Sequence, residues 1–214
     1  MTNQELENLT FHYFTDQFCR RALTALFQAY DRTYKYCRAN YAEPEATNLW
    51  PYERRAKFEG YLRDAAAMSP DLVATAVKAE KGNWYHTEIR GGPLMMTSSS
   101  VPTPGAMVDQ SDFRLTLATN NDLKLFDDPD EPAPDTLYVL LLHSRSHRLG
   151  DEDPLATVNL PGSAYFGFPA PGLRNYLHRI NLFDKYRETI RELTPKQWDE
   201  PTFLRYLGRA RMVG

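Results

Sequence analysis

A continuous apolar run at residues 137–142 constrains the fold of this chain more than any other feature, because its side chains are apolar on every side. The run follows a proline-rich acidic segment and ends in the polar letters HSRSHR. A strand that is buried on both faces has this pattern, whereas a half-exposed strand alternates apolar and polar residues. A helix is the alternative, with Asp135 as its N-cap and Gly150 as its stop. The position of the run between a loop and a polar tail favours a buried strand over Thr136–Leu142.

The first third of the chain has apolar residues at spacings of three and four, which is typical of helices. We expect one helix to start at Thr15 or Asp16, because either side chain can accept a hydrogen bond from a free amide. Pro44 disfavours its continuation, and Pro51 suits the first turn of a second helix. A third helix is expected over residues 71–81.

After residue 83 the apolar residues alternate instead, which indicates strands. Strands are expected over residues 84–90, 112–120, 122–126 and 155–162, with residues 93–101 either a strand or a loop. The second and third of these strands would form a hairpin through the turn pair Asn120-Asn121. The aromatic segment at residues 163–172 predicts a core-filling hinge, with stacking on a planar ligand as the alternative. Helices are expected over residues 173–183, 185–193 and 201–212.

Helices first, strands in a cluster and helices last are typical of the α+β class with a mainly antiparallel sheet. We therefore expect an N-terminal helical region over residues 1–83. Residues 84–214 are expected to form an α+β region with the central sheet and C-terminal helices. The two regions are predicted to pack together as one unit.

The composition excludes several classes of protein. Hydrophobic residues make up 42% of the chain and charged residues 25%, which is ordinary for a globular protein. The longest apolar runs fall well short of the roughly 18 residues that a membrane span needs. The first residues, MTNQELENLT, lack the basic start and apolar stretch of a secretory signal. Cys19 and Cys37 make neither a disulfide framework nor a CxxC metal pair, so we expect a cytoplasmic protein that binds no membrane.

The polar tail of the buried strand is the first candidate site. In a strand, His143, Arg145 and His147 share one face while Ser144 and Ser146 share the other. At about 3.3 Å per residue the two histidines stand about 13 Å apart, too far for both to bind one zinc ion at about 2.1 Å. The row suits an extended anion such as a phosphate backbone, with Arg145 as the bidentate donor. The alternative is a strand that ends in solvent, where basic residues prevent edge pairing.

These features predict a non-catalytic binding or accessory protein that contacts a protein or nucleic-acid partner through a local basic surface. The net charge of −3 disfavours broad nonspecific DNA binding, because phosphate affinity depends on many cationic contacts. No cofactor is expected, and a homo-oligomer is left open. The residues expected to form the surface are His143, Arg145, His147, Arg148, Arg205, Arg209 and Arg211.

A competing prediction is a metal-dependent phosphodiesterase. Asp112 and the letters DLK at Asp122–Lys124 outline a D…(D/E)xK pattern, which resembles that of restriction-type nucleases. The resemblance implies that Asp112 and Asp122 hold Mg²⁺ or Mn²⁺ while Lys124 steadies the attacking water or scissile phosphate. Glu53 or Glu59 would complete the set. The chain departs from the family pattern before Asp122, where ATNN is a polar turn in place of an apolar strand.

Overall fold

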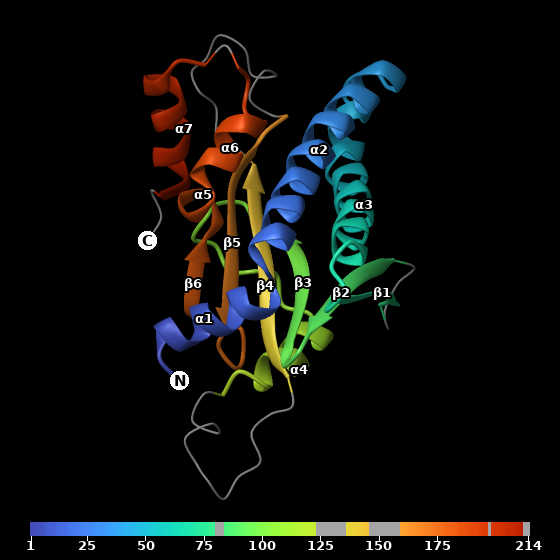
Figure 1. The fold of residues 1–214 in the computed structure, drawn as a ribbon. Helices are drawn as coiled ribbons and strands as arrows, with labels where there is room; N and C mark the ends of the chain where they lie inside the picture. Colours follow the sequence, from blue (N-terminus) through green and yellow to red (C-terminus); the bar gives the residue numbers. More distant parts are fainter. Residues whose placement is uncertain (80–83, 123–135, 146–158, 197, 212–214) are drawn as a thin grey trace, which may run out of the picture.

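The computed structural model confirms the α+β class. Its described residues are 1–79, 84–122, 136–145, 159–196 and 198–211. They contain seven helices and a six-stranded, mainly antiparallel sheet, with 49% helix and 25% strand (Figure 1). In chain order the elements are α1 (Asn3–Tyr13), α2 (Asp16–Asn40), α3 (Glu45–Ala67), β1 (Val73–Lys78), β2 (Tyr85–Gly91), β3 (Leu94–Ser100), α4 (Asp112–Thr119), β4 (Leu137–Arg145), β5 (Pro161–Pro169), β6 (Tyr176–Asn181), α5 (Leu182–Lys185), α6 (Arg187–Leu193) and α7 (Glu200–Arg211).

The strands lie in the sheet in chain order, from β1 at one edge to β6 at the other. Neighbouring strands are antiparallel except β3 and β4, which run in the same direction with Leu94 opposite Leu137 and Ser100 opposite His143. A parallel pair needs a crossover connection, and α4 lies in that connection. The carboxyl ends of β3 and β4 therefore meet at one end of the sheet, where both strands become polar.

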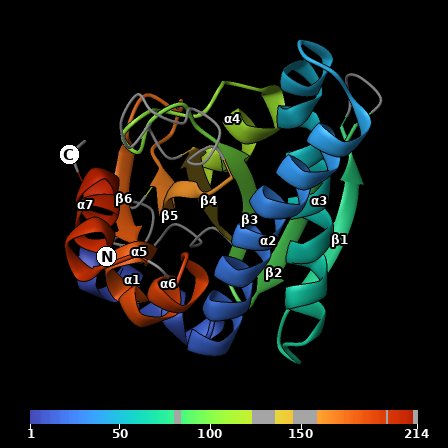
Figure 2. The same ribbon diagram turned by 90° about the horizontal axis from the view of Figure 1, so that it is seen from above.

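Strand β4 is buried on both faces, which confirms the prediction for residues 136–142. Alternate residues of the strand face two separate apolar clusters. One face, with Leu137, Val139 and Leu141, packs against the cluster under α1, α2, α3 and α7. The other face, with Tyr138 and Leu140, packs beneath α4 and the segment that precedes it. Figure 2 shows α2 and α3 on one side of the sheet and α4 on the other.

The helix predicted from Thr15 is confirmed as α2, with the Thr15 hydroxyl accepting a hydrogen bond from the Phe18 amide. The second predicted helix is α3, but it begins at Glu45, so that Pro51 lies inside the helix and not in its first turn. Pro44 stands at the N-cap position and marks the helix start. The predicted helices at residues 185–193 and 201–212 correspond to α6 and α7.

The helix predicted over residues 71–81 is wrong, because this segment contains the edge strand β1. The strand pairs with β2 along its whole length, but most of its side chains are exposed on either face. An exposed edge strand lacks the apolar alternation that marks a strand in sequence, so pairing with β2 decides its conformation. The prediction of a strand over residues 84–90 is confirmed as β2.

The strand predicted over residues 112–120 is wrong as well, because these residues form the short helix α4. Only Ala118 of this helix is buried. A helix with one buried residue shows no clear helical spacing of apolar positions, so alternating Phe and Leu residues suggested a strand. The hairpin built on this strand is absent from the described residues, and its return beyond Asp122 lies outside them.

The segment at residues 173–183 contains strand β6 and not the predicted helix. Leu173 and Ile180 have helical spacing, but they pack in the two different apolar clusters on opposite faces of the sheet. The spacing therefore did not mark one face. The aromatic segment at residues 163–172, predicted to be a hinge, mostly belongs to β5, whose Phe166 and Phe168 fill the core. The first half of the strand predicted at residues 155–162 lies outside the described residues, and its last two residues begin β5.

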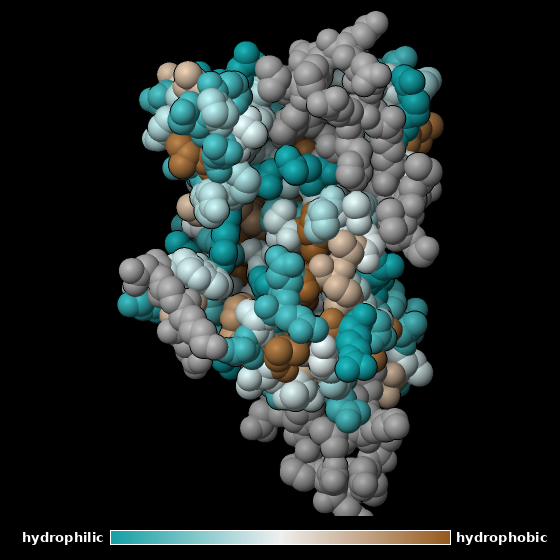
Figure 3. Space-filling model, turned by 180° about the vertical axis from the view of Figure 1, so that it is seen from behind, coloured by the Kyte–Doolittle hydropathy of each residue, from teal (hydrophilic) through white to brown (hydrophobic). Residues whose placement is uncertain are grey.

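The larger apolar cluster contains residues of both halves of the chain, from Leu6 in α1 to Leu207 in α7. Figure 3 shows the side of the molecule that carries α4, where brown apolar groups are visible among hydrophilic ones. No helix in the described part of the chain combines the length and the apolar character needed to cross a membrane.

Candidate anion-binding site

A polar pocket of about 270 Å³ opens at the carboxyl end of β3, between α3 and the start of α4. We call it the arginine pocket, because Arg54, Arg55 and Arg114 line it. The serine run Ser98–Ser100 at the end of β3 and His143 of β4 line it too. The pocket thus lies at the end of the sheet where the two parallel strands finish.

Arg54 is buried in the pocket, with 5% of its surface exposed. Its guanidinium lies 4.5 Å from the centroid of the Tyr30 ring, a cation–π contact. Within the described residues it has neither a hydrogen bond nor a carboxylate partner. Burial lowers the pKa of Arg54, because desolvation disfavours the charged form. A buried, unpaired guanidinium is costly, and an anion in the pocket would supply the missing partner.

Arg55 follows on the same helix and lies with its guanidinium 4.2 Å from the centroid of the Trp84 ring. Burial lowers its pKa, while the nearby Glu59 carboxylate opposes that change. Glu59 nevertheless makes no ion pair with an arginine within 4 Å in the described part of the chain. The Arg55 guanidinium donates no hydrogen bond to another described residue, and its contact is with the indole ring.

Arg114 enters the pocket from α4, on the other side of the sheet. Its two terminal nitrogens donate hydrogen bonds to the Asp109 carbonyl at 3.0 Å and to the Ser99 hydroxyl at 3.1 Å. Its Nε is buried and lacks a partner among the described residues. The side chain is therefore held at the pocket wall with hydrogen-bonding capacity left over.

The acidic residue Glu59 is tied to the sheet. Its carboxylate accepts hydrogen bonds from the Thr87 amide and the Ser98 hydroxyl, both at 2.6 Å. Ser98 and Ser99 alternate along β3, so that Ser98 points to α3 and Ser99 to Arg114 of α4. This alternation is why the end of one strand can connect both helices that border the pocket.

His143, predicted to belong to an exposed basic row, is 3% exposed and forms part of the pocket floor. Its Nδ1 lies 3.0 Å from the Tyr30 hydroxyl, which donates its single proton to the Ser144 carbonyl at 3.0 Å. Nδ1 therefore carries the imidazole proton and donates it to the hydroxyl oxygen. Burial, with the charge of Arg54, lowers the pKa of His143 to about 3. The imidazole is neutral at pH 7, which corrects the prediction that it adds positive charge to a surface.

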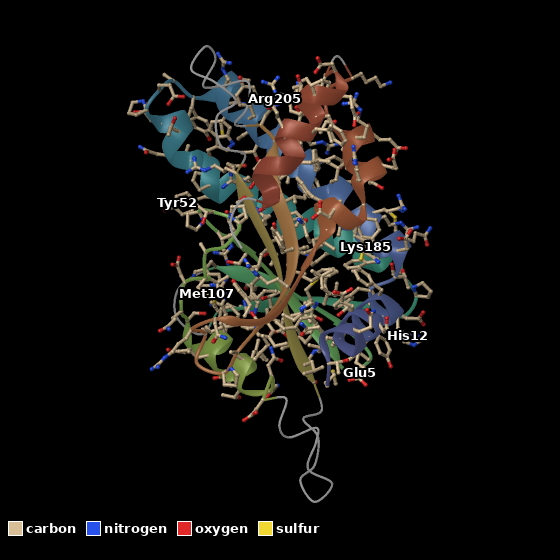
Figure 4. All side chains as sticks on the ribbon, turned by 90° about the vertical axis from the view of Figure 1, so that its left-hand side faces the viewer. Glu5, His12, Tyr52, Met107, Lys185 and Arg205 are labelled. Carbon is tan, nitrogen blue, oxygen red and sulfur yellow. The ribbon has the colours of Figure 1, made fainter. Side chains whose placement is uncertain are left out.

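Of the other residues of the predicted surface, the structure describes the side chains of Arg145 and Arg205. Arg145 is exposed at the end of β4, and its charge, with that of Arg54, opposes the burial that raises the pKa of Tyr30 to about 12. His147 and Arg148 lie outside the described residues. Arg205 is exposed on α7, whereas Tyr52 of the arginine pocket lies on α3 (Figure 4). The side chains of Arg209 and Arg211 also lie outside the described part.

The residues of the predicted metal site are placed differently from the expected hairpin. Asp112 is the first residue of α4 and Asp122 follows the end of that helix, so the helix separates them. Lys124 lies outside the described residues. The Glu59 carboxylate accepts hydrogen bonds from Thr87 and Ser98, and the Glu53 carboxylate pairs with the Lys57 ammonium at 2.8 Å. Within the described ranges, no group of three or more His, Cys, Asp or Glu side chains is arranged to hold a metal ion.

Sequence reasoning missed all three pocket arginines. Arg54 and Arg55 lie in a predicted helix and Arg114 in a predicted strand, and none of the three was predicted to belong to a site. The serine run at residues 98–100 was the available signal. Comparisons with protein-family models, curated proteins and solved structures found no match for this chain.

Proposed function

We propose that this protein is a non-catalytic binding protein that captures an anionic group, such as a phosphate, of its partner in the arginine pocket. The observation that carries the proposal is Arg54, a buried guanidinium that has no hydrogen-bond or carboxylate partner among the described residues. Two further arginines line the same pocket. The planar fork of a guanidinium matches the oxygens of phosphate and carboxylate groups, which makes arginine the usual residue for such recognition.

The charge of the pocket supports the proposal. Arg54, Arg55 and Arg114 bring three positive charges, and the nearby Arg145 extends them toward the surface. Glu59 is held by two donors of the sheet, so its charge is partly satisfied within the protein. A concave site with excess positive charge attracts anions and concentrates them at its mouth.

The protonation states of the lining groups favour binding over proton transfer. Arginine stays protonated at neutral pH, and His143, with a pKa of about 3, is a weak base. We therefore propose that the anion belongs to a protein or nucleic-acid partner, and that the arginine pocket is the local basic surface that binds it. The metal-dependent phosphodiesterase stays a prediction, which an assay for cleavage of DNA or RNA tests.

We also propose a cytoplasmic location. Cys19 and Cys37 are free and buried. Burial raises the pKa of the Cys19 thiol to about 12, which keeps it protonated and unreactive. Two unpaired thiols suit a reducing compartment, where such side chains act as small apolar groups.

The test measures thermal unfolding and calorimetric binding with inorganic phosphate, pyrophosphate and acetate. A ligand that binds the folded state raises the unfolding temperature with its concentration, so phosphate is expected to stabilise the wild-type protein. Arg54→Met should abolish this stabilisation. It should not itself lower stability much, because it replaces an unpaired buried charge with an apolar chain of similar length.

The matched control is Arg205→Met, which removes an exposed arginine of the originally predicted surface. This variant should keep full phosphate binding. Equal phosphate stabilisation in Arg54→Met and the wild type would overturn the arginine pocket as the site. The wild-type protein is also incubated with DNA or RNA in the presence of Mg²⁺ or Mn²⁺. Cleavage that Asp122→Ala abolishes would overturn the non-catalytic role and support the phosphodiesterase.

A further inference from the structure

A second pocket, of about 420 Å³, lies beside the arginine pocket on the face of the sheet that carries α4. The end of the β1–β2 pair and the start of α4 form it. We call it the aromatic pocket, because Trp84, His86 and Phe113 line it. The rings of His86 and Phe113 are stacked, with their centroids 4.5 Å apart and their planes at 17°. Trp84 is 37% exposed and therefore presents ring surface to a ligand.

The wall between the two pockets consists of two pairs of an arginine and an aromatic ring. In the first pair the Arg55 guanidinium lies 4.2 Å from the centroid of the Trp84 ring. In the second pair the Arg114 guanidinium lies 5.3 Å from the centroid of the Phe113 ring. In both pairs the cation lines the arginine pocket and the ring lines the aromatic pocket. One ligand can therefore place an anionic group on one side and a planar ring on the other.

Polar groups of the aromatic pocket have hydrogen-bonding capacity that the described residues do not use. His86 is 5% exposed, and its Nε2 lies 3.4 Å from a Glu88 carboxylate oxygen. Its Nδ1 is buried without a partner in the described part, as is the hydroxyl of Ser111. Glu88 lines the pocket as well. A ring with donors and acceptors on its edge fits this lining better than a purely apolar ring does.

We infer that the two pockets together bind a nucleotide, with its phosphate in the arginine pocket and its base in the aromatic pocket. The inference rests on the proposed anion-binding function and adds the chemical class of the ligand. A nucleobase combines a stacking face with a polar edge, and its phosphate lies one sugar away. The nucleotide is either a free mononucleotide or part of a single-stranded nucleic acid, since both present the same chemistry.

The experiment compares the affinities of the intact protein for inorganic phosphate, ribose 5-phosphate, adenosine, the four nucleoside monophosphates and a short single-stranded oligonucleotide. At least one monophosphate is expected to bind about ten-fold or more tightly than ribose 5-phosphate, because stacking of one base contributes a factor of this size. Binding should also quench tryptophan fluorescence, since the base would lie on Trp84.

Two variants separate the base from the phosphate. Trp84→Leu and Phe113→Leu should each reduce the advantage of the monophosphate over ribose 5-phosphate. In this ratio any change in the phosphate contacts of Arg55 or Arg114 cancels, because both ligands carry the same phosphate. Tyr85→Leu is the matched control, since Tyr85 is the next residue, is 56% exposed and lines neither pocket. It should leave every affinity unchanged. Thermal unfolding of each variant checks that it is folded.

The outcomes distinguish this inference from the function on which it rests. One outcome is that phosphate binding depends on Arg54 but that neither a monophosphate nor the oligonucleotide binds more tightly. This outcome overturns the inference of a nucleotide ligand and leaves the proposed anion-binding function intact. Failure of every anion to bind overturns both. Tighter binding of the oligonucleotide than of the monophosphates supports the inference with a nucleic acid as the source, and the reverse order supports it with a free nucleotide.

Discussion

The guanidinium of Arg54 lies over the ring of Tyr30, 4.5 Å from its centroid, at the point where α3 meets α2. The hydroxyl of the same tyrosine accepts a hydrogen bond from His143 and donates one to the Ser144 carbonyl. Tyr30 therefore holds both the positive charge that lines the arginine pocket and the neutral imidazole beneath it. This arrangement is the basis of the first two predictions.

Replacing Tyr30 by phenylalanine should destabilise the protein by about 1–3 kcal/mol. The change leaves two buried groups, the His143 Nδ1–H and the Ser144 carbonyl, without the hydroxyl that now satisfies them. Urea unfolding monitored by circular dichroism gives the difference in free energy. Tyr34→Phe is the control, because that hydroxyl accepts a hydrogen bond from Arg38 at an exposed position. A loss no larger than that of Tyr34→Phe would contradict the buried network.

The buried His143 should make stability depend on pH. Its pKa in the folded protein is about 3, below the usual value near 6.5, so unfolding takes up a proton as the pH falls. The contribution of His143 is fully present above pH 6.5 and is lost as the pH falls toward 3, by at most ~1.4 kcal/mol per pH unit. Urea unfolding at pH 7 and pH 5 measures this slope.

The comparison uses His143→Gln, which should lose less stability between pH 7 and pH 5 than the wild type, by about 1–2 kcal/mol. An identical slope in the two proteins would show that His143 titrates normally in the folded state.

Removing the negative charge of Glu59 should tighten phosphate binding. Glu59 lines the arginine pocket, and a unit charge a few ångströms from the ligand changes affinity about two-fold to ten-fold in a partly solvated site. Glu59→Gln keeps the shape and can still bond the Thr87 amide and the Ser98 hydroxyl. The control is Glu53→Gln on the same helix, where the carboxylate pairs with Lys57. Calorimetric titration with phosphate compares them, and weaker binding by Glu59→Gln would place the anion elsewhere.

Local patterns predicted β4 and α2, two elements in which burial gives the apolar residues a regular pattern. Strand β4 is apolar on both faces because both faces are covered, and α2 shows helical spacing because one face packs on the sheet. Patterns failed for β1 and α4, because most of their side chains are solvated and carry no spacing imposed by a core. The segment of β6 was predicted as a helix because Leu173 and Ile180 stand at a helical interval. In the structure these two residues pack in different apolar clusters, so their spacing does not mark one helix face.

The sequence by itself determined the α+β class and the buried central strand, because the periodicity of apolar residues reports burial directly. Only the tertiary structure decided the candidate site. Arg54 and Arg114 lie far apart in the chain and meet because α3 and α4 cover opposite faces of the sheet at the end of β3. Only the fold makes His143 neutral, because its pKa depends on burial and on the charge of Arg54, neither of which a local pattern contains.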